Sequence, residues 1–292
     1  MNNYTVKIDT GKEALLREFF ARENAAISAQ QYAFWRAKTS KYTAIFYNSG
    51  KFLVQGADVS EIATKVEAFL GIKSVPPAKT PDIAVPVKHI GVDESGKGDF
   101  FGPLVIAGVL TDENSSEILL KAGIKDCKKV SDAQIPKLAA AVKNNCVFSI
   151  VTINPAKYNE LYAKFGNLNK LLAWGHARTI ENILEKADCE YALSDKFGDE
   201  KLIKNALMGK GQNIKLEQRC KAESDIAVAA ASILAREQFL KIMADFSSKY
   251  GVQIPKGCNS AVIDAAREIA GRFSKDELKN LVKTHFKTFQ EL

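Results

Sequence analysis

Hydrophobic and polar residues alternate with two different periods along the first 70 residues. Alternation at every second position predicts strands over 4–8, 32–36, 42–47 and 51–55, with Asn48-Ser49-Gly50 as a hairpin turn between the last two. Apolar residues three to four positions apart predict helices over 12–23 and 59–70. This order predicts a small α+β unit in which the helices cover one face of a sheet.

A proline-rich segment follows this unit, because four of the eight prolines fall within 74–87. Proline fixes φ and lacks a backbone donor, so we expect an extended segment without regular structure. We interpret it as a linker between a first domain, 1–73, and a second domain, 88–292. The alternative is a long loop inside one domain, although structureless loops of this length are uncommon.

Strand-like and helical patterns alternate beyond the linker. Strands are predicted near 88–91, leading into 92–98, and over 104–110, 146–153, 191–194 and 213–217; helices are predicted over 132–144, 156–162, 168–185, 201–208 and 224–246. Such alternation is typical of an α/β domain with a mixed sheet.

The composition is that of a globular protein, with 292 residues, 46% hydrophobic and 26% charged. The longest apolar stretches, 100–110 and 226–235, reach only about half of the ~20 residues that a membrane helix needs. The N-terminal segment lacks the apolar run of a signal peptide. Five cysteines without a C-x-x-C pair disfavour a disulfide framework or a zinc cage. We therefore expect a soluble cytoplasmic protein with reduced thiols.

A net charge of +7 favours a polyanionic partner. No Asp or Glu occurs between Glu23 and Asp58, and this acid-free window mixes basic with aromatic side chains. Its members are Arg36, Lys38, Lys41 and Lys51 with Tyr32, Phe34, Trp35, Tyr42, Phe46 and Tyr47. Such a mixture suits nucleic acid, because basic groups neutralise phosphates and aromatic rings stack on bases or sugars. The alternative is an aromatic core with solvated charges, and strand alternation buries about half of these side chains in either case.

The segment 91–99 (GVDESGKGD) allows two interpretations. Its glycine and lysine spacing matches the first seven positions of a phosphate-binding P-loop. However, Gly98 stands where a hydroxyl is needed, Asp93 and Glu94 would repel phosphate, and Phe100-Phe101-Gly102-Pro103 follows where a helix is required. The second interpretation makes Asp93 and Glu94 ligands of a divalent cation at a strand end, because Mg²⁺ prefers carboxylate oxygens.

Further acids support the metal interpretation. Asp195 follows a predicted strand, and Asp225 precedes a helix whose start, 226–235, is almost entirely small and apolar and is therefore expected to be buried. An acid at this position is stabilised by the helix dipole, so Asp225 is either a capping residue or a member of the site. Glu223 is a neighbouring acid, and Lys221 is a candidate phosphate contact.

At these residues the chain resembles ribonuclease HIII, a bacterial type 2 ribonuclease H, over nearly its whole length. The similar blocks are 93–104 (DESGKGDFFGPL), 126–132 (DCKKVSD, with Cys127 where serine is usual), 158–160 (YNE), 167–169 (NLN), 172–176 (LAWGH), 221–225 (KAESD) and 283–286 (KTHF). The first 70 residues resemble the TATA-binding-protein-like substrate domain of that family.

The resemblance implies a ribonuclease-H-like fold for the second domain and a catalytic, metal-ligating set of Asp93, Glu94, Asp195 and Asp225. It implies endonucleolytic hydrolysis of the RNA strand of RNA·DNA hybrids with two Mg²⁺ or Mn²⁺ ions, leaving 5′-phosphate and 3′-hydroxyl ends. Glu94 is the expected reader of the ribose 2′-hydroxyl or the residue that orients a water. The implied partner is hybrid duplex, with no membrane and no stable protein partner, and we expect a monomer.

Substrate contacts are expected in both domains. The expected residues are Ser95, Gly96, Lys97, Gly98, Lys128, Lys129 and Lys221 in the second domain and Arg36, Lys38 and Lys51 in the first. His176 and His285 are expected to be packing or capping residues rather than catalytic bases. Three alternatives remain open: cleavage at single ribonucleotides embedded in DNA, as in ribonuclease HII; a hybrid-binding protein without activity; and a P-loop nucleotidase.

Overall fold

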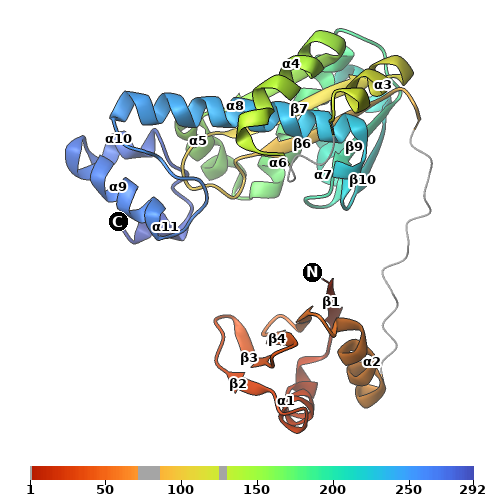
Figure 1. Ribbon diagram of the computed structural model, residues 1–292, viewed down its shortest axis with the longest axis vertical. Coiled ribbons are helices and arrows are strands. Elements are labelled where there is room, and N and C mark those ends of the chain that lie inside the picture. Colours follow the sequence, from red (N-terminus) through yellow and green to blue (C-terminus); the bar gives the residue numbers. More distant parts are fainter. Residues whose placement is uncertain (1, 72–85, 125–129) are drawn as a thin grey trace. The chain divides into compact units, whose positions relative to one another are not determined.

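The computed structural model describes residues 2–71, 86–124 and 130–292 (Figure 1). The chain divides into two compact units, Met1–Ile83 and Ala84–Leu292. The predicted linker lies almost entirely outside the described residues, and so do Cys127, Lys128 and Lys129.

The first unit is an antiparallel sheet with two helices. Its strands are β1 (Asn2–Lys7), β2 (Ala26–Ser28), β3 (Ala33–Lys38), β4 (Tyr42–Tyr47) and β5 (Lys51–Gly56), and its longer helices are α1 (Glu13–Arg22) and α2 (Val59–Leu70). The strand order is β1-β5-β4-β3-β2. The four strands and two helices predicted from the hydrophobic pattern are confirmed. The strand β2 was not predicted, because its three residues are too few for a periodic signal.

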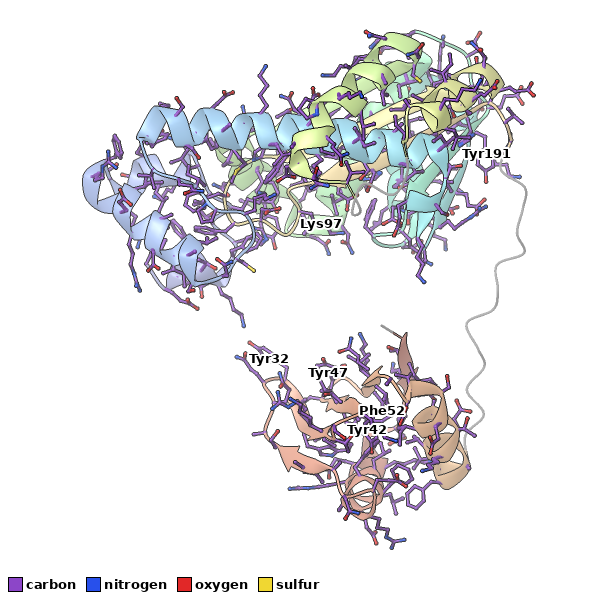
Figure 2. The ribbon with its side chains drawn as sticks, in the orientation of Figure 1. Tyr32, Tyr42, Tyr47, Phe52, Lys97 and Tyr191 are labelled. Carbon is purple, nitrogen blue, oxygen red and sulfur yellow. The ribbon has the colours of Figure 1, made fainter. Side chains whose placement is uncertain are left out.

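One face of this sheet forms the core of the unit with the helices. Trp35 and Phe52 are buried there against Phe20 of α1, and Phe46 packs on both of them. The aromatic residues of the acid-free window divide between the two environments (Figure 2). Trp35, Tyr42 and Phe46 are in the core; Tyr32 and Phe34 are exposed, and Tyr47 is half-buried. The core interpretation is therefore confirmed for Trp35, Tyr42 and Phe46, whereas the nucleic-acid interpretation stays a prediction for the exposed rings.

The second unit is built on a mixed five-stranded sheet, which confirms the predicted fold class. Its strands are β6 (His89–Ser95), β7 (Leu104–Thr111), β8 (Val147–Ile153), β9 (Tyr191–Asp195) and β10 (Lys215–Arg219). The order is β10-β9-β6-β7-β8, in which β10, β9 and β6 are parallel and β7 and β8 run antiparallel to their neighbours. The strand β7 is buried over its whole length because helices cover both faces.

Helices form a layer on each side of this sheet (Figure 1). One layer contains α3 (Glu113–Lys121), α4 (Ile135–Asn145) and α8 (Ile226–Tyr250), and the other contains α5 (Pro155–Phe165), α6 (Leu168–Leu184) and α7 (Glu200–Ala206). The start of α8 lies directly on β6, since a Cβ at Gly91 would be 2.2 Å from the backbone of Ala227. Its residues 227–235 are buried, as the small apolar sequence predicts.

A C-terminal helical segment completes the unit with α9 (Ser260–Arg272), α10 (Lys275–Lys279) and α11 (Lys287–Gln290). Buried Lys283 connects this segment to the loop before β7, because its Nζ donates to the backbone oxygens of Asp99 at 2.9 Å and Gly102 at 2.7 Å. Among the helices of the described residues, none combines the length and the apolar character that a membrane-spanning segment requires.

Candidate active site

Two acids meet at the carboxyl end of the parallel strands. The register pairs Val92 of β6 with Ser194 of β9, so Asp93 and Asp195 are the next residues along the two strands. Glu94 follows Asp93 within the last three residues of β6. The carboxyl ends of parallel strands point to the same edge of a sheet, and the expected proximity of these acids follows from that geometry.

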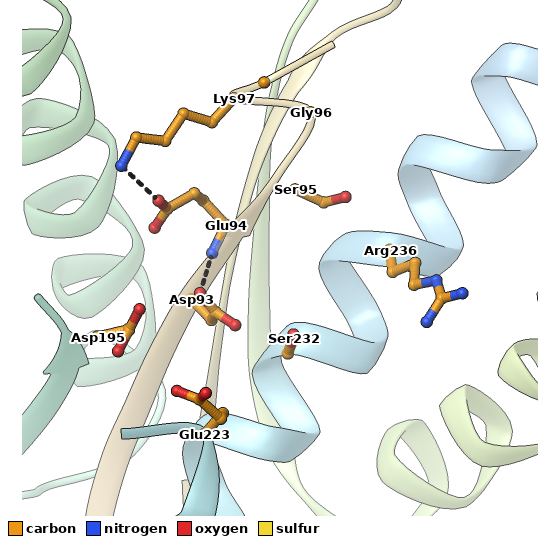
Figure 3. A pocket seen from close by; sticks show the side chains of 10 residues that line it. Asp93, Glu94, Ser95, Gly96, Lys97, Asp195, Glu223, Ser232 and Arg236 are labelled. Carbon is orange, nitrogen blue, oxygen red and sulfur yellow. Dashed lines mark hydrogen bonds and ion pairs between the residues drawn. The ribbon is translucent and has the colours of Figure 1, made fainter. Parts of the chain in front are cut away.

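The acids line a cavity of about 330 Å³ (Figure 3). Its lining residues are Asp93, Glu94, Ser95, Gly96, Lys97, Gly98, Asp195, Glu223, Ser232 and Arg236. Three of the four predicted catalytic acids are in this set. The fourth carboxylate of the cavity belongs to Glu223, which lies in a short 3₁₀ turn, Ala222–Ser224, between β10 and α8.

Asp225 is not among the residues that line the cavity, and its membership of the carboxylate set stays a prediction. Its side chain caps α8 by accepting hydrogen bonds from the backbone N–H groups of Ala227 (2.9 Å) and Val228 (3.1 Å). The same carboxylate accepts from Nε2 of buried His89 at 3.0 Å. Although burial opposes its ionisation, these partners hold the pKa of Asp225 below its usual value. The sequence signal was available, because an Asp directly before an apolar helix is a preferred N-cap.

Asp93 is the least favourable place in the cavity for a negative charge. Burial, together with the charge of Glu94, raises the pKa of Asp93 to about 7. The backbone N–H of Glu94 donates to Asp93 Oδ1 at 2.8 Å and partly offsets this effect. Burial and the charges of Glu223 and Glu94 also raise the pKa of Asp195. Repulsion among the acids therefore makes the cavity favourable for a cation.

Glu94 has partners on both oxygens. Lys97 Nζ lies 3.3 Å from Oε1, and His176 Nε2 lies 3.1 Å from Oε2. Burial opposes ionisation, but these two contacts hold the pKa of Glu94 below its usual value. His176 is fully buried, as expected, yet its contact with a pocket acid was not predicted.

The turn after β6 decides between the P-loop and the metal-ligand interpretation of the segment 91–99. Gly91 lies inside β6, and the segment after the turn leads to β7 rather than to a helix, so the P-loop interpretation is wrong. Gly96 adopts a φ of +86°, and a Cβ there would be 2.1 Å from the backbone oxygen of Pro103. A Cβ at Gly98 would meet nothing within 4 Å, which leaves open space beside Lys97.

Other predicted residues lie around the cavity or away from it. Lys221 is exposed at a φ of +60° in the turn before Glu223 and is not a lining residue. Arg236 was not predicted; its side chain lines the cavity and donates to the Val130 oxygen and to Asp132 at 3.0 Å each. His285 stacks on Tyr162 with ring centroids 4.2 Å apart, in agreement with a packing role. Arg36, Lys38 and Lys51 belong to strands β3 and β5 of the first unit.

The donor set of the cavity suits a hard divalent cation, because all four acids offer oxygen ligands. In the described part of the chain, no group of three or more His, Cys, Asp or Glu side chains is already arranged as a metal cage. Asp93, Glu94 and Asp195 are instead held by local donors: Asp195 Oδ1, for example, accepts from the Ala222 N–H at 3.2 Å. The acids line one cavity, so a bound cation would replace these donors as the partner of their charges.

Comparison with family models agrees with the two-unit description. Residues 90–289 match the model described as ribonuclease HII, and residues 8–79 match one described as a domain of unknown function, DUF3378.

Curated relatives are similar over nearly the whole chain. Ribonuclease HIII of Protochlamydia amoebophila (strain UWE25) is 41% identical over 283 residues, covering 96% of this chain and 93% of the relative. Ribonuclease HIII of Chlamydia pneumoniae is 40% identical over 304 residues, covering 99% and 97%.

Solved structures show the same architecture. The crystal structure of Bst-RNase HIII in complex with Mn²⁺ has a TM-score of 0.68 at 26% identity and covers 99% of this chain and 97% of that one. The crystal structure of Aquifex aeolicus RNase H3 has a TM-score of 0.57 at 25% identity, covering 97% and 99%.

Proposed function

Since the chain belongs to the ribonuclease HIII family of type 2 ribonucleases H, we propose that this endoribonuclease cleaves the RNA strand of RNA·DNA hybrids and leaves 5′-phosphate and 3′-hydroxyl ends. We further propose Mg²⁺ or Mn²⁺ as its cofactor. The observation that carries the proposal is the cavity at the end of β6 and β9, where four carboxylates lie beside a glycine-rich turn with a lysine.

The proposed metal ligands are Asp93, Glu94, Asp195 and Glu223, with Glu223 in place of Asp225. When bound, two divalent ions would supply an activated water and would stabilise the charge on the leaving 3′-oxygen. Asp93 is the ligand candidate whose negative charge is least favourable without a cation, because burial and the charges of Glu94 and Asp195 raise its pKa to about 7. A cation there would offset both the burial and the repulsion that raise the pKa of Asp93.

The remaining cavity residues would hold and orient the substrate. Lys97 supplies a positive charge at the rim, and the open space at Gly98 admits a nucleic-acid backbone close to the turn. Glu94 lies next to Asp93 and is the proposed group that accepts the ribose 2′-hydroxyl proton, which distinguishes RNA from DNA. Ser95, Gly96, Lys128, Lys129 and Lys221 remain proposed substrate contacts of this unit.

The proposed role of the first unit is to bind the duplex. Strand alternation places Arg36, Lys38 and Lys51 on the sheet face opposite to buried Trp35 and Phe52. Basic side chains spread over an open face would contact several phosphates without reading a sequence.

Three duplexes test the proposal: an RNA·DNA hybrid, a DNA duplex with one ribonucleotide, and a double-stranded RNA. Each is end-labelled and incubated with Mg²⁺, Mn²⁺ or EDTA. We expect metal-dependent cuts inside the RNA tract of the hybrid, with products that a ligase joins without prior phosphorylation. Preferential cutting of the single-ribonucleotide duplex would support the ribonuclease HII-like alternative, and absence of metal-dependent cleavage of any substrate would contradict the proposal.

A further inference from the structure

A buried histidine connects two acids of the cavity. His176 on α6 has no solvent exposure, and its two ring nitrogens face different strands. Nε2 lies 3.1 Å from Glu94 Oε2 on β6, and Nδ1 lies 3.0 Å from Ser194 Oγ on β9. Ser194 Oγ also lies 3.0 Å from the backbone oxygen of Asp195. Because Ser194 directly precedes Asp195 on β9, the contacts of His176 link Glu94 with the strand end that carries Asp195.

The donor in the hydrogen bond between His176 and Glu94 follows from the chemistry of the two groups. An ionised carboxylate only accepts hydrogen bonds, so the His176 Nε2–H donates to Glu94. A donor in a buried position keeps its geometry, because neither water nor a flexible side chain competes with it.

Lys97, the other partner of Glu94, is exposed to solvent, unlike His176. Lys97 has a side chain that is 37% exposed, and its Nζ is 3.3 Å from Oε1. An exposed lysine on a flexible stem is free to exchange a carboxylate for a substrate phosphate. His176 is fully buried between the Phe197 ring and the strands β6 and β9, so its contact with Glu94 is kept when substrate arrives.

We propose that His176 is a positioning residue of the active site, which aims the Glu94 carboxylate into the cavity and, through Ser194, sets its place relative to Asp195. This inference rests on the proposed function, since it assumes that Glu94 and Asp195 bind divalent cations. Partners that orient metal ligands in this way typically change metal affinity or activity by about 10- to 100-fold when they are removed. His176 itself would contact neither metal nor substrate.

The test compares three variants of the full-length protein. His176→Leu removes the donor, and His176→Gln keeps an N–H near the place of Nε2. The matched control is Thr179→Val, a fully buried position on the same helix whose hydroxyl donates to the Gly175 oxygen at 2.9 Å. Mn²⁺ binding is measured by calorimetry without substrate, kcat and KM are measured on an RNA·DNA hybrid at saturating Mn²⁺, and circular dichroism checks folding.

We expect His176→Leu to weaken Mn²⁺ binding by about 10- to 100-fold and to lower kcat, with KM for the hybrid changed less than about threefold. His176→Gln should recover at least half of the loss on a logarithmic scale, and Thr179→Val should behave as wild type. Ser194→Ala, a smaller change, should weaken Mn²⁺ binding by a few-fold and serves if His176→Leu does not fold.

Two results would overturn the inference. One is wild-type Mn²⁺ affinity in folded His176→Leu or, if that variant does not fold, in Ser194→Ala. The other is equal loss in His176→Leu, His176→Gln and Thr179→Val, which would indicate packing alone. A wild-type protein that binds Mn²⁺ but cleaves no hybrid would instead contradict the proposed function, so the two failures are distinguishable.

Discussion

Each of the two units is built on five strands, but the sheets present their functional residues in different ways. In the first unit, α1 and α2 cover one face, and alternate residues such as Arg36, Lys38 and Lys51 stand on the other. In the second unit, helices cover both faces, and the cavity acids lie where β6 and β9 end and in the turn before α8. A face spreads many weak contacts over a large area, whereas a strand end concentrates a few charges in one cavity.

This difference predicts different responses to substitution. Phosphate contacts on a face act additively, so each substitution removes only a part of the binding free energy. Carboxylates that share a metal site act as a unit, so the loss of one removes most of the activity. The predictions below test this contrast.

The largest effect is expected from Asp93→Asn. The substitution keeps the size of the side chain but removes the charge of the Asp93 carboxylate from the cavity. Activity on hybrid in Mg²⁺ should fall by about three decades or more, because the stabilisation that a metal gives to the transition state is lost. Asp264→Asn, an exposed position on α9, is the control and should keep full activity. Near-normal cleavage by Asp93→Asn would show that the cavity is not the catalytic centre.

Glu223 and Asp225, which lie two residues apart in the block 221–225, provide the next test. Glu223→Gln should lower kcat by about two decades or more, since Glu223 lines the cavity. Asp225→Asn should stay within about threefold of wild-type activity but lose about 1–2 kcal/mol of unfolding free energy, because Asn keeps the helix cap and loses the charged hydrogen bond from His89. Activity assays measure kcat of the two variants, and urea unfolding measures their unfolding free energy. The reverse pattern, with activity lost at Asp225 and kept at Glu223, would restore the assignment made from the sequence.

A smaller effect is expected from the first unit. Deleting residues 1–76 should weaken hybrid binding at least tenfold and leave metal-dependent cleavage at high enzyme concentration, since the four cavity acids belong to the second unit. If the unit contacts ~3–4 phosphates, the slope of log affinity against log salt should flatten by about 3 units. Filter binding at several salt concentrations measures this slope.

Replacing Arg36, Lys38 and Lys51 together by Ala should reproduce much of that loss without changing the cut positions. Arg17, Arg22 and Lys65 lie on the helices α1 and α2, and their replacement by Ala removes the same charge from the helical side. We expect little change in this control. Equal losses in both triple variants would show that the net charge matters and the sheet face does not.

The smallest effect concerns the stability of the metal-free protein. Folding raises the pKa of Asp93 to about 7 from 3.8, so the folded protein retains a proton that the unfolded chain has released between these values. Stability contributed by this group therefore falls as the pH rises from about 4 through about 7. In EDTA, Asp93→Asn should melt at a higher temperature than wild type at pH 8, and the difference should shrink at pH 5. A difference independent of pH would argue against a buried charge at Asp93.

Periodicity was sufficient for most of the secondary structure. The boundaries of β4 and α2 agree with the hydrophobic pattern to the residue, because each element has one buried face whose spacing is visible in the sequence. Short elements such as β2 and α11 were not predicted, since three or four residues do not establish a period. The C-terminal helices α9 and α10 were also not predicted.

The sequence by itself determined the order of the elements, the acid-free window and the block that contains Asp93 and Glu94. These features are local, because they depend on residue types and spacings within about ten positions. The sequence also placed Asp195 at the end of a strand, where the parallel register brings it beside Asp93.

Only the tertiary structure decided which acids share the cavity and what holds them. Glu223 and Asp225 are two residues apart, yet the turn before α8 directs one into the cavity and uses the other as a helix cap. His176 and Glu94 are 82 positions apart and come into contact only when α6 packs on the sheet with His176 level with the end of β6. Contacts of this kind depend on strand register and helix docking, which no local pattern encodes.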